Sequence, residues 1–210
     1  MSLTQEISEL VQAGSAKKVK VLVQQALDEG IAAKDILEEG LLAGIDVIGE
    51  KFKNNEVFLP EVLVSARAMN MGMSILRPYL VQDGVEEKGT VVCGTVKGDL
   101  HDIGKNLVKI MLEGKGLKVI DLGVDVSPEA FVDAAIENNA KVICCSALLT
   151  TTMVEMKNVV DEATRRGVRD QIKIMVGGAP LTQSFCDSVG ADFYTSDAAS
   201  CADAALSFCI

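Results

Sequence analysis

The chain contains a single histidine, His101, within the segment GTVKGDLHDIGKNLV at residues 94–108. Asp99 stands two positions before this histidine, and Gly104 stands three positions after it. A carboxylate that accepts a hydrogen bond from one imidazole nitrogen orients the ring and leaves the other nitrogen free to bind a metal. The pattern makes His101 a candidate metal ligand with Asp99 as its partner, but an isolated pair of this kind also fits an ordinary surface loop.

Two later segments, CCSALLTTTM and MVGGAP, add small and hydroxyl-bearing residues. The first contains Ser146, Leu148 and three consecutive threonines, and such residues also serve as helix caps. The second contains Gly177 and Gly178, and paired glycines permit either a tight turn or the close approach of a bulky ligand to the backbone. Each segment taken alone leaves both interpretations open.

All three segments lie where strands of a parallel sheet are expected to end. After residue 88, short β-branched runs alternate with helical stretches, which is typical of right-handed βαβ units. The predicted strands cover 90–96, 118–122, 141–147, 172–176 and 192–194, and the predicted helices lie near 103–115, 128–139, 152–167, 181–189 and 197–208. Ligands of such sheets bind outside the carboxyl ends of the strands, so we expect the site at that edge of a five-stranded, flavodoxin/Rossmann-like domain.

The first part of the chain is patterned differently, with apolar residues recurring at helical spacing. Four amphipathic stretches with short connections predict an antiparallel four-helix bundle, and Pro60 suits the first turn of the fourth helix. A polar stretch with two glycines at residues 81–89 predicts a linker. We therefore expect an α/β protein with an all-α N-terminal domain, divided into a helical domain at 1–88 and an α/β domain at 89–210.

Composition narrows the class of function. The chain carries a net charge of −10 without a basic stripe, so binding to nucleic acid or to a membrane surface is not expected. No apolar run approaches the roughly 20 residues of a membrane span, and the segment MSLTQEISEL lacks the features of a secretory signal, so a cytoplasmic protein is expected. The six cysteines show no C-x-x-C spacing, which favours reduced structural thiols over a zinc site or disulfides.

Together the three segments are more specific than any one of them. The motifs D-x-H-x-x-G, S-x-L and G-G follow one another at separations of 41 and 28 residues. Their residues are Asp99, His101, Gly104, Ser146, Leu148, Gly177 and Gly178. This arrangement resembles the signature of cobalamin-binding domains. The stretch GEKFKNNEVFLPEVLVSARAM at 49–69 is similar to the helical cap that accompanies such a domain in methionine synthase and in the corrinoid subunits of methyltransferase systems.

The resemblance implies a corrinoid cofactor, as methylcobalamin, cob(I)alamin or a related corrinoid, with His101 as the axial ligand of cobalt. Asp99 and Thr152 would form a relay behind the histidine. The contact residues would be Gly98, Asp99, His101, Asp102, Ile103, Gly104, Ser146, Leu148, Thr150, Thr152, Gly177 and Gly178 in the α/β domain, and Phe58, Leu59 and Val62 in the helical cap. The cap residues would cover the methyl-bearing face of the corrin, although ordinary bundle-core roles stay open for each of them.

The function implied by the resemblance is that of a methyl carrier, not catalytic alone. A donor-specific methyltransferase would load cob(I)alamin, a second methyltransferase would deliver the methyl group to tetrahydrofolate or a thiol, and a reductive activase would restore oxidised cofactor. The sequence leaves open the methyl donor (methanol, methylamine, a methoxyaromatic compound or betaine), the acceptor, the oligomeric state and the lower base of the corrinoid.

Three other classes of protein fit the sequence less well. A cobalamin-dependent mutase subunit shares the motifs but usually lacks the helical cap. A cobalamin-sensing regulator keeps the cap but usually adds a DNA-binding domain. A flavodoxin-like receiver or nucleotide binder leaves the joint spacing of the motifs unexplained. The methyl carrier is therefore the preferred interpretation.

Overall fold

The computed structural model describes residues 2–85 and 87–210, which form two compact units, one on each side of residue 86. The first unit is helical and the second is an α/β domain, so the predicted fold class is confirmed. The predicted domain boundary, between residues 88 and 89, lies two residues beyond this division. Within the described ranges no helix combines the length and the apolar character needed to cross a membrane.

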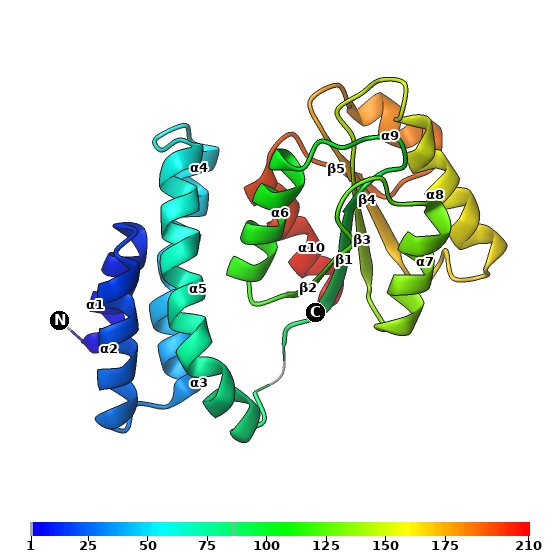
Figure 1. Ribbon diagram of the computed structural model, residues 1–210. Helices are drawn as coiled ribbons and strands as arrows, with labels where there is room; N and C mark the ends of the chain where they lie inside the picture. Colours follow the sequence, from blue (N-terminus) through cyan, green and yellow to red (C-terminus); the bar gives the residue numbers. More distant parts are fainter. Residues whose placement is uncertain (1, 86) are drawn as a thin grey trace. The chain divides into compact units, whose positions relative to one another are not determined.

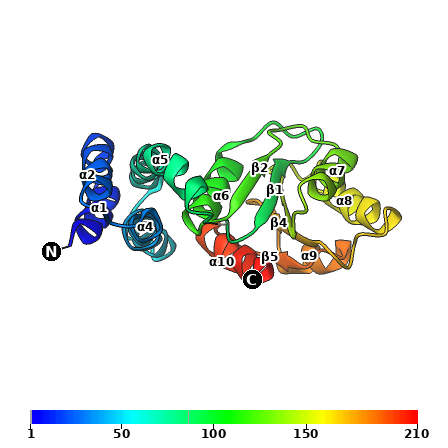
Figure 2. The same cartoon turned by 90° about the horizontal axis from the view of Figure 1, so that it is seen from below.

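Four helical stretches make up the first unit (Figures 1 and 2). They comprise α1 (Leu3–Gln12), α2 (Ala16–Asp28), a continuous run of α3 (Ala33–Asp35), η1 (Ile36–Leu42) and α4 (Ala43–Lys53), and α5 (Leu59–Gln82). Ser2 starts α1 because its hydroxyl accepts the Gln5 N–H while the Gln5 side chain accepts the Ser2 N–H. Helix α2 packs on α5, and α1 packs on η1 and α4, so each stretch has apolar neighbours.

The third helical stretch departs from a regular α-helix, because η1 is π-helical, which the apolar spacing did not predict. Gly44 follows η1 and lies against α1. A Cβ at this position would lie 2.8 Å from the Ser8 carbonyl oxygen and 2.8 Å from Val11 Cβ. Only glycine allows the two backbones to approach this closely.

Helix α5 extends further than the predicted linker allows. Val81 and Gln82 belong to the last turn of α5, whereas the prediction placed them in the linker. The helix continues because Leu76 and Leu80, one turn apart, remain buried and stabilise its end. Glu86, also part of the predicted linker, lies outside the described residues.

The second unit is built on a parallel sheet with helices on both faces. Its strands are β1 (Thr90–Thr95), β2 (Lys118–Asp121), β3 (Val142–Ser146), β4 (Lys173–Gly177) and β5 (Phe193–Tyr194), in the spatial order β2-β1-β3-β4-β5. The helices are α6 (Ile103–Gly114), α7 (Pro128–Glu137), α8 (Val154–Arg165), α9 (Gln183–Val189) and α10 (Ala198–Cys209). Helices α6 and α10 pack together on one face, and α7 and α8 pack together on the other (Figures 1 and 2).

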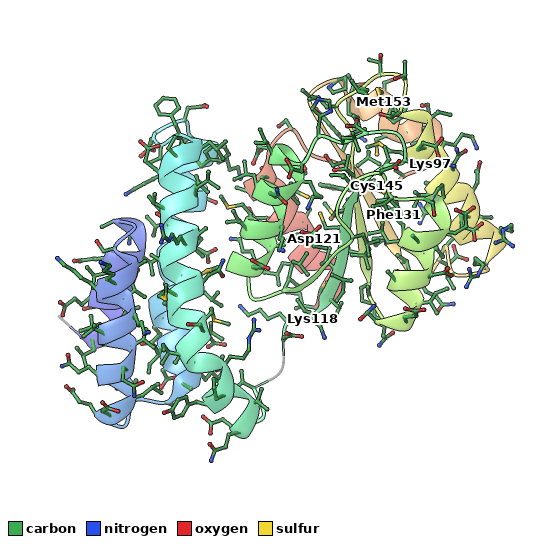
Figure 3. All side chains as sticks on the ribbon, in the orientation of Figure 1. Lys97, Lys118, Asp121, Phe131, Cys145 and Met153 are labelled. Carbon is green, nitrogen blue, oxygen red and sulfur yellow. The ribbon has the colours of Figure 1, made fainter. Side chains whose placement is uncertain are left out.

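The strand order reverses between β1 and β3, the point at which doubly wound sheets bind ligands. The register pairs Thr95 with Ser146 and Ser146 with Gly177, so the last residues of β1, β3 and β4 lie in one row. Figure 3 shows Lys97, after β1, and Met153, before α8, at one end of this domain, and Lys118, at the start of β2, at the other end. The three sequence motifs therefore meet at one edge of the sheet.

Gly177 and Gly178, at the end of β4, allow a test of how closely the backbone is packed at this edge of the sheet. Gly178 has a φ of +141°, and a Cβ there would lie 1.9 Å from the Ala147 carbonyl oxygen. Gly178→Ala should therefore lower the free energy of unfolding by more than about 2 kcal/mol, through backbone strain and steric overlap.

Gly177→Ala is the matched control, because a Cβ at that position would come only within 4.0 Å of the Thr195 carbonyl oxygen. This variant should change the free energy of unfolding by less than about 1 kcal/mol. Urea denaturation of both variants measures the difference. Equal effects would show that the contact between Gly178 and Ala147 is not tight.

Candidate functional site

The Asp99 carboxylate joins the loop after β1 to the loop after β3. Its Oδ1 accepts the backbone N–H of His101 at 3.0 Å and lies 2.8 Å from His101 Nδ1. Its Oδ2 accepts the N–H groups of Leu148 at 2.7 Å and Leu149 at 3.0 Å, and lies 3.1 Å from the Thr152 hydroxyl. The side chain is fully buried, yet both oxygens are hydrogen-bonded, so the charge is compensated.

These hydrogen bonds fix the ionisation state of Asp99. Burial by itself raises the pKa of this carboxyl group, but the N–H groups of Leu149, His101 and Leu148 and the His101 ring lower it by more. The net pKa lies well below its ordinary value. Asp99 is therefore a carboxylate at neutral pH and can only accept hydrogen bonds.

An ionised Asp99 determines the tautomer of His101. Because Oδ1 is an acceptor, Nδ1 carries a proton and donates it, which leaves the lone pair on Nε2. The His101 side chain is 51% exposed, and no hydrogen-bond partner of Nε2 is found within residues 2–85 and 87–210. The main chain is also held, because the buried Thr95 hydroxyl donates to the His101 carbonyl oxygen at 2.8 Å. The ring thus presents a free nitrogen from a fixed loop.

Thr152 completes this group of residues from the turn between β3 and α8. Its hydroxyl lies 3.1 Å from Asp99 Oδ2 and 2.9 Å from the Leu149 carbonyl oxygen. One hydroxyl proton serves both acceptors, so it can turn between them. The hydrogen bond from Thr152 to Asp99 can therefore strengthen or weaken without displacing the backbone.

Apolar side chains surround the histidine on the exposed surface. Leu100 is 70% exposed and Ile103 is 69% exposed, and both belong to the loop and helix start that carry His101. Leu148 and Leu149, whose N–H groups bind Asp99, are 43% and 41% exposed. Four exposed aliphatic residues around one imidazole form a surface that a large, partly apolar ligand would cover.

The structure brings the predicted residues of the α/β domain to one edge. Ser146 and Gly177 end adjacent strands, and Gly178 follows at once. The other predicted residues that are exposed in this domain are Gly98, His101, Asp102, Ile103, Gly104, Leu148 and Thr150. Of the two predicted threonines, Thr152 is the one whose hydroxyl is hydrogen-bonded to Asp99.

The predicted residues of the helical unit divide into two groups. Phe58 is 68% exposed and Leu59 is half-buried, at the start of α5. Val62 has no exposed surface, because it lies on the same face of α5 as Ser65, whose hydroxyl donates to the Gln12 carbonyl oxygen within the bundle. Val62 is a core residue here and offers no free surface to a ligand.

Two residues of the site were not predicted from the sequence. Leu149 donates its backbone N–H to Asp99, a role that any residue type could fill. Thr95 is a fully buried threonine at the end of β1, and a buried hydroxyl requires a partner. That partner is the His101 carbonyl oxygen, so the threonine that closes the run TVVCGT was the available signal.

The side chains available to bind a metal indicate which kind of metal cofactor the site can hold. The described part of the chain contains no group of three or more His, Cys, Asp or Glu side chains that could hold an ion. A single imidazole suits a metal that brings its other ligands with it, as in a macrocycle. A Cβ at Gly104 would meet no atom within 4 Å, and Gly177 is nearly as open, so there is space beside the histidine. These features fit a corrinoid.

Comparisons with known proteins also indicate a corrinoid cofactor. Two family profiles, each described as a B12 binding domain, match residues 89–204 and residues 3–77. A corrinoid protein of Desulfitobacterium hafniense is 44% identical over 195 residues, which cover 91% of this chain and 90% of the relative. The trimethylamine corrinoid protein of Methanosarcina barkeri is 45% identical over 175 residues, covering 82% of this chain and 81% of the relative.

Solved structures extend the similarity to both units. A chain of the methanol:cobalamin methyltransferase complex of Methanosarcina barkeri matches with a TM-score of 0.87 and 31% identity, over 98% of this chain and 80% of that chain. A cobalamin-binding protein of Desulfitobacterium hafniense matches with a TM-score of 0.81 and 28% identity, over 99% of this chain and 98% of that chain. The chain therefore belongs to the family of corrinoid proteins that carry B12 binding domains.

Proposed function

We propose that this protein is the corrinoid methyl-carrier subunit of a methyltransferase system. The observation that carries the proposal is the Asp99–His101 pair, in which a buried carboxylate holds Nδ1 at 2.8 Å and the exposed ring keeps the lone pair of Nε2 available. A bound cobalamin supplies a cobalt atom that accepts a methyl group as cob(I)alamin and releases it as methylcobalamin.

His101 would hold the cobalt of the bound corrinoid through Nε2. Asp99 keeps the ring in the correct tautomer and orientation, the role that carboxylates play behind metal-bound histidines. The Thr152 hydroxyl adjusts the basicity of Asp99, because it can donate either to the carboxylate or to the Leu149 carbonyl oxygen. The relay therefore controls how strongly His101 donates to the metal.

The remaining residues at the sheet edge would hold the rest of the cofactor. Gly98, Asp102, Ile103 and Gly104 would lie beneath the corrin, with the Ile103 side chain covered on binding. The residues that would line the slot for the nucleotide tail are Ser146, Leu148, Thr150, Gly177 and Gly178. Support comes from the open space at Gly177 and the shared row of Ser146 and Gly177.

In the helical domain, Phe58 and Leu59 would shield the methyl-bearing face of the corrin. Both lie at the start of α5, and Phe58 is the more exposed of the two. Val62, predicted with them, would act indirectly by holding α5 in its bundle.

The carrier would work with a donor-specific methyltransferase, a second methyltransferase that uses tetrahydrofolate or a thiol, and a reductive activase. Support for the first partner comes from the similar chain in the methanol:cobalamin methyltransferase complex. Relatives named as trimethylamine and dimethylamine corrinoid proteins favour the carrier over a mutase subunit or a sensor. A methylamine or methanol is therefore the favoured class of methyl donor.

His101→Ala tests the axial ligand. The visible spectrum of the wild type reconstituted with methylcobalamin should be that of the base-off, histidine-on form, whereas the variant should lack an axial nitrogen. The exposed ring contributes little to stability, so the variant should lose only about 1 kcal/mol of folding free energy. Added imidazole should restore the wild-type spectrum, and identical spectra of variant and wild type without imidazole would contradict the assignment.

Asp99→Asn tests the orientation of the ring. The amide must direct its NH₂ group at N–H donors, so we expect a loss of about 2–4 kcal/mol in folding free energy. The asparagine either turns its NH₂ group toward Nδ1, which removes the acceptor, or offers Nδ1–H a neutral amide oxygen in place of a carboxylate. Nε2 then carries a proton in part of the population, and the histidine-on fraction falls. Asp161→Asn removes the charge of an exposed carboxylate that is paired with Lys157 on the surface of α8, and it should change neither quantity. An unchanged histidine-on fraction in Asp99→Asn would refute the role.

Gly177→Ala tests the cofactor slot. Because the added methyl group meets almost no protein atom, the apoprotein should remain folded. The methyl group would occupy space intended for the nucleotide tail, so cobalamin should bind roughly tenfold more weakly. Equilibrium titration of the apoprotein measures this, and wild-type affinity in the variant would place the tail elsewhere.

A further inference from the structure

The loop after β2 runs beside the loop that carries Asp99 and His101. The Thr95 N–H donates to the Gly123 carbonyl oxygen at 2.9 Å, and the Val126 N–H donates to the Thr95 carbonyl oxygen at 3.0 Å. Val96 and Val126 also form a parallel bridge outside the named strands. The pairing of these two chain segments therefore continues past the end of the sheet, toward the histidine loop.

Asp125 makes the last two contacts of this pairing. Its Oδ1 accepts the Gly98 N–H at 2.7 Å, and its own N–H donates to the Asp99 carbonyl oxygen at 3.0 Å. The first bond involves the N–H group at the start of the Gly98–Asp99 dipeptide, and the second involves the carbonyl group at its end. Asp125 is therefore hydrogen-bonded to both ends of the dipeptide Gly98–Asp99.

The two hydrogen bonds join residues whose backbones both have positive φ, Asp125 and Gly98. Asp125 has a φ of +55°, and the other non-glycine residues with positive φ in the described part of the chain are Asn55 and Asn139. Gly98, whose N–H group donates to Asp125, has a φ of +80°. An aspartate in the left-handed region persists only where its surroundings fix it, and such residues gather at functional sites.

The two sides of Asp99 are thus held by different loops. The loop after β3 binds its carboxylate, through Leu148 and Leu149, and the loop after β2 binds its main chain, through Asp125. His101 is bonded to the same carboxylate at 2.8 Å. A change in how Asp125 holds the main chain therefore moves the acceptor that orients the ring.

We propose that Asp125 is a positioning residue for His101, and that its two hydrogen bonds to Gly98 and Asp99 set the fraction of bound cobalamin whose cobalt carries the histidine. The inference rests on the proposed function, because it concerns the same ligand. The imidazole is hydrogen-bonded to Asp99, whereas Asp125 is hydrogen-bonded to the backbone of the histidine loop and acts through it.

Three substitutions of Asp125 separate the effect of its side-chain hydrogen bond from the effect of its positive φ. Asp125→Ala removes the side-chain acceptor and leaves a strained φ, whereas Asp125→Gly removes the acceptor and relieves the strain. Asp125→Asn keeps an acceptor oxygen and tolerates positive φ, as Asn55 and Asn139 do in this chain. Asp161→Ala is the matched control for loss of an exposed carboxylate in the same domain.

The first readout is the visible spectrum at saturating cobalamin. Asp125→Ala and Asp125→Gly should lower the ratio of histidine-on to histidine-off cofactor by about fivefold to tenfold. This is less than the full effect of one hydrogen bond to a charged group, because Asp125 acts on His101 through the main chain. Asp125→Asn should stay within about twofold of the wild type, and Asp161→Ala should match it. A purely structural role would lower the thermal stability of the variants without changing this ratio in the folded, loaded protein.

The second readout needs no cofactor. Hydrogen exchange of the Gly98 amide in the apoprotein should accelerate by about tenfold in Asp125→Ala and Asp125→Gly, because that amide loses its acceptor. Asp125→Asn should retain most of the protection.

The possible outcomes distinguish a failure of the role of Asp125 from a failure of the proposed function. If the wild type is histidine-on and Asp125→Ala has the same ratio, the inference about Asp125 is overturned while the proposed function stands. An equal fall in Asp125→Asn and Asp125→Ala also overturns it, since the acceptor would then not matter. If the wild type never gives a histidine-on spectrum, the proposed ligand fails, and the role of Asp125 fails with it.

Discussion

The buried Asp99 carboxylate is the constraint on which the rest of the site depends. It receives the ring and backbone of His101 on one oxygen and the N–H groups of Leu148 and Leu149 on the other. A buried charge is tolerable only when donors surround it, and here those donors come from two loops at the ends of adjacent strands. The strand order β2-β1-β3 is what makes these ends neighbours. The fold thus supplies the donors, and the ionised carboxylate in turn fixes the tautomer of the histidine.

Much of this arrangement could be predicted from the sequence. Alternating β-branched and helical runs predicted the five strands. The signal is plainest for the inner strands β1, β3 and β4, because strands buried on both faces of a parallel sheet are nearly continuous apolar segments. The contact between Thr152 and Asp99 followed from the resemblance to cobalamin-binding domains and from the position of the threonine after β3. The register then explains why motifs separated by 41 and 28 residues meet, since Thr95, Ser146 and Gly177 lie in one row.

Other features had no local signal in the sequence. Asp125 and Leu149 act through main-chain groups or through a carboxylate on a turn, and neither role requires a recognisable motif. Val62 fits helical spacing equally well as a ligand contact or as a core residue, and only its burial on the Ser65 face of α5 decides between them. The π-helical turn of η1 was missed because the apolar spacing of Ile36 and Leu41 is compatible with both helix types.

The most direct test uses the fact that the chain has one histidine. The apoprotein would be prepared with ¹⁵N-labelled histidine, loaded with unlabelled cob(II)alamin and examined by electron paramagnetic resonance. If His101 binds cobalt, the three-line nitrogen splitting seen with unlabelled protein should become a two-line splitting in the labelled protein. A splitting that stays three-line would show that the cofactor's own base remains the ligand, and would contradict the account.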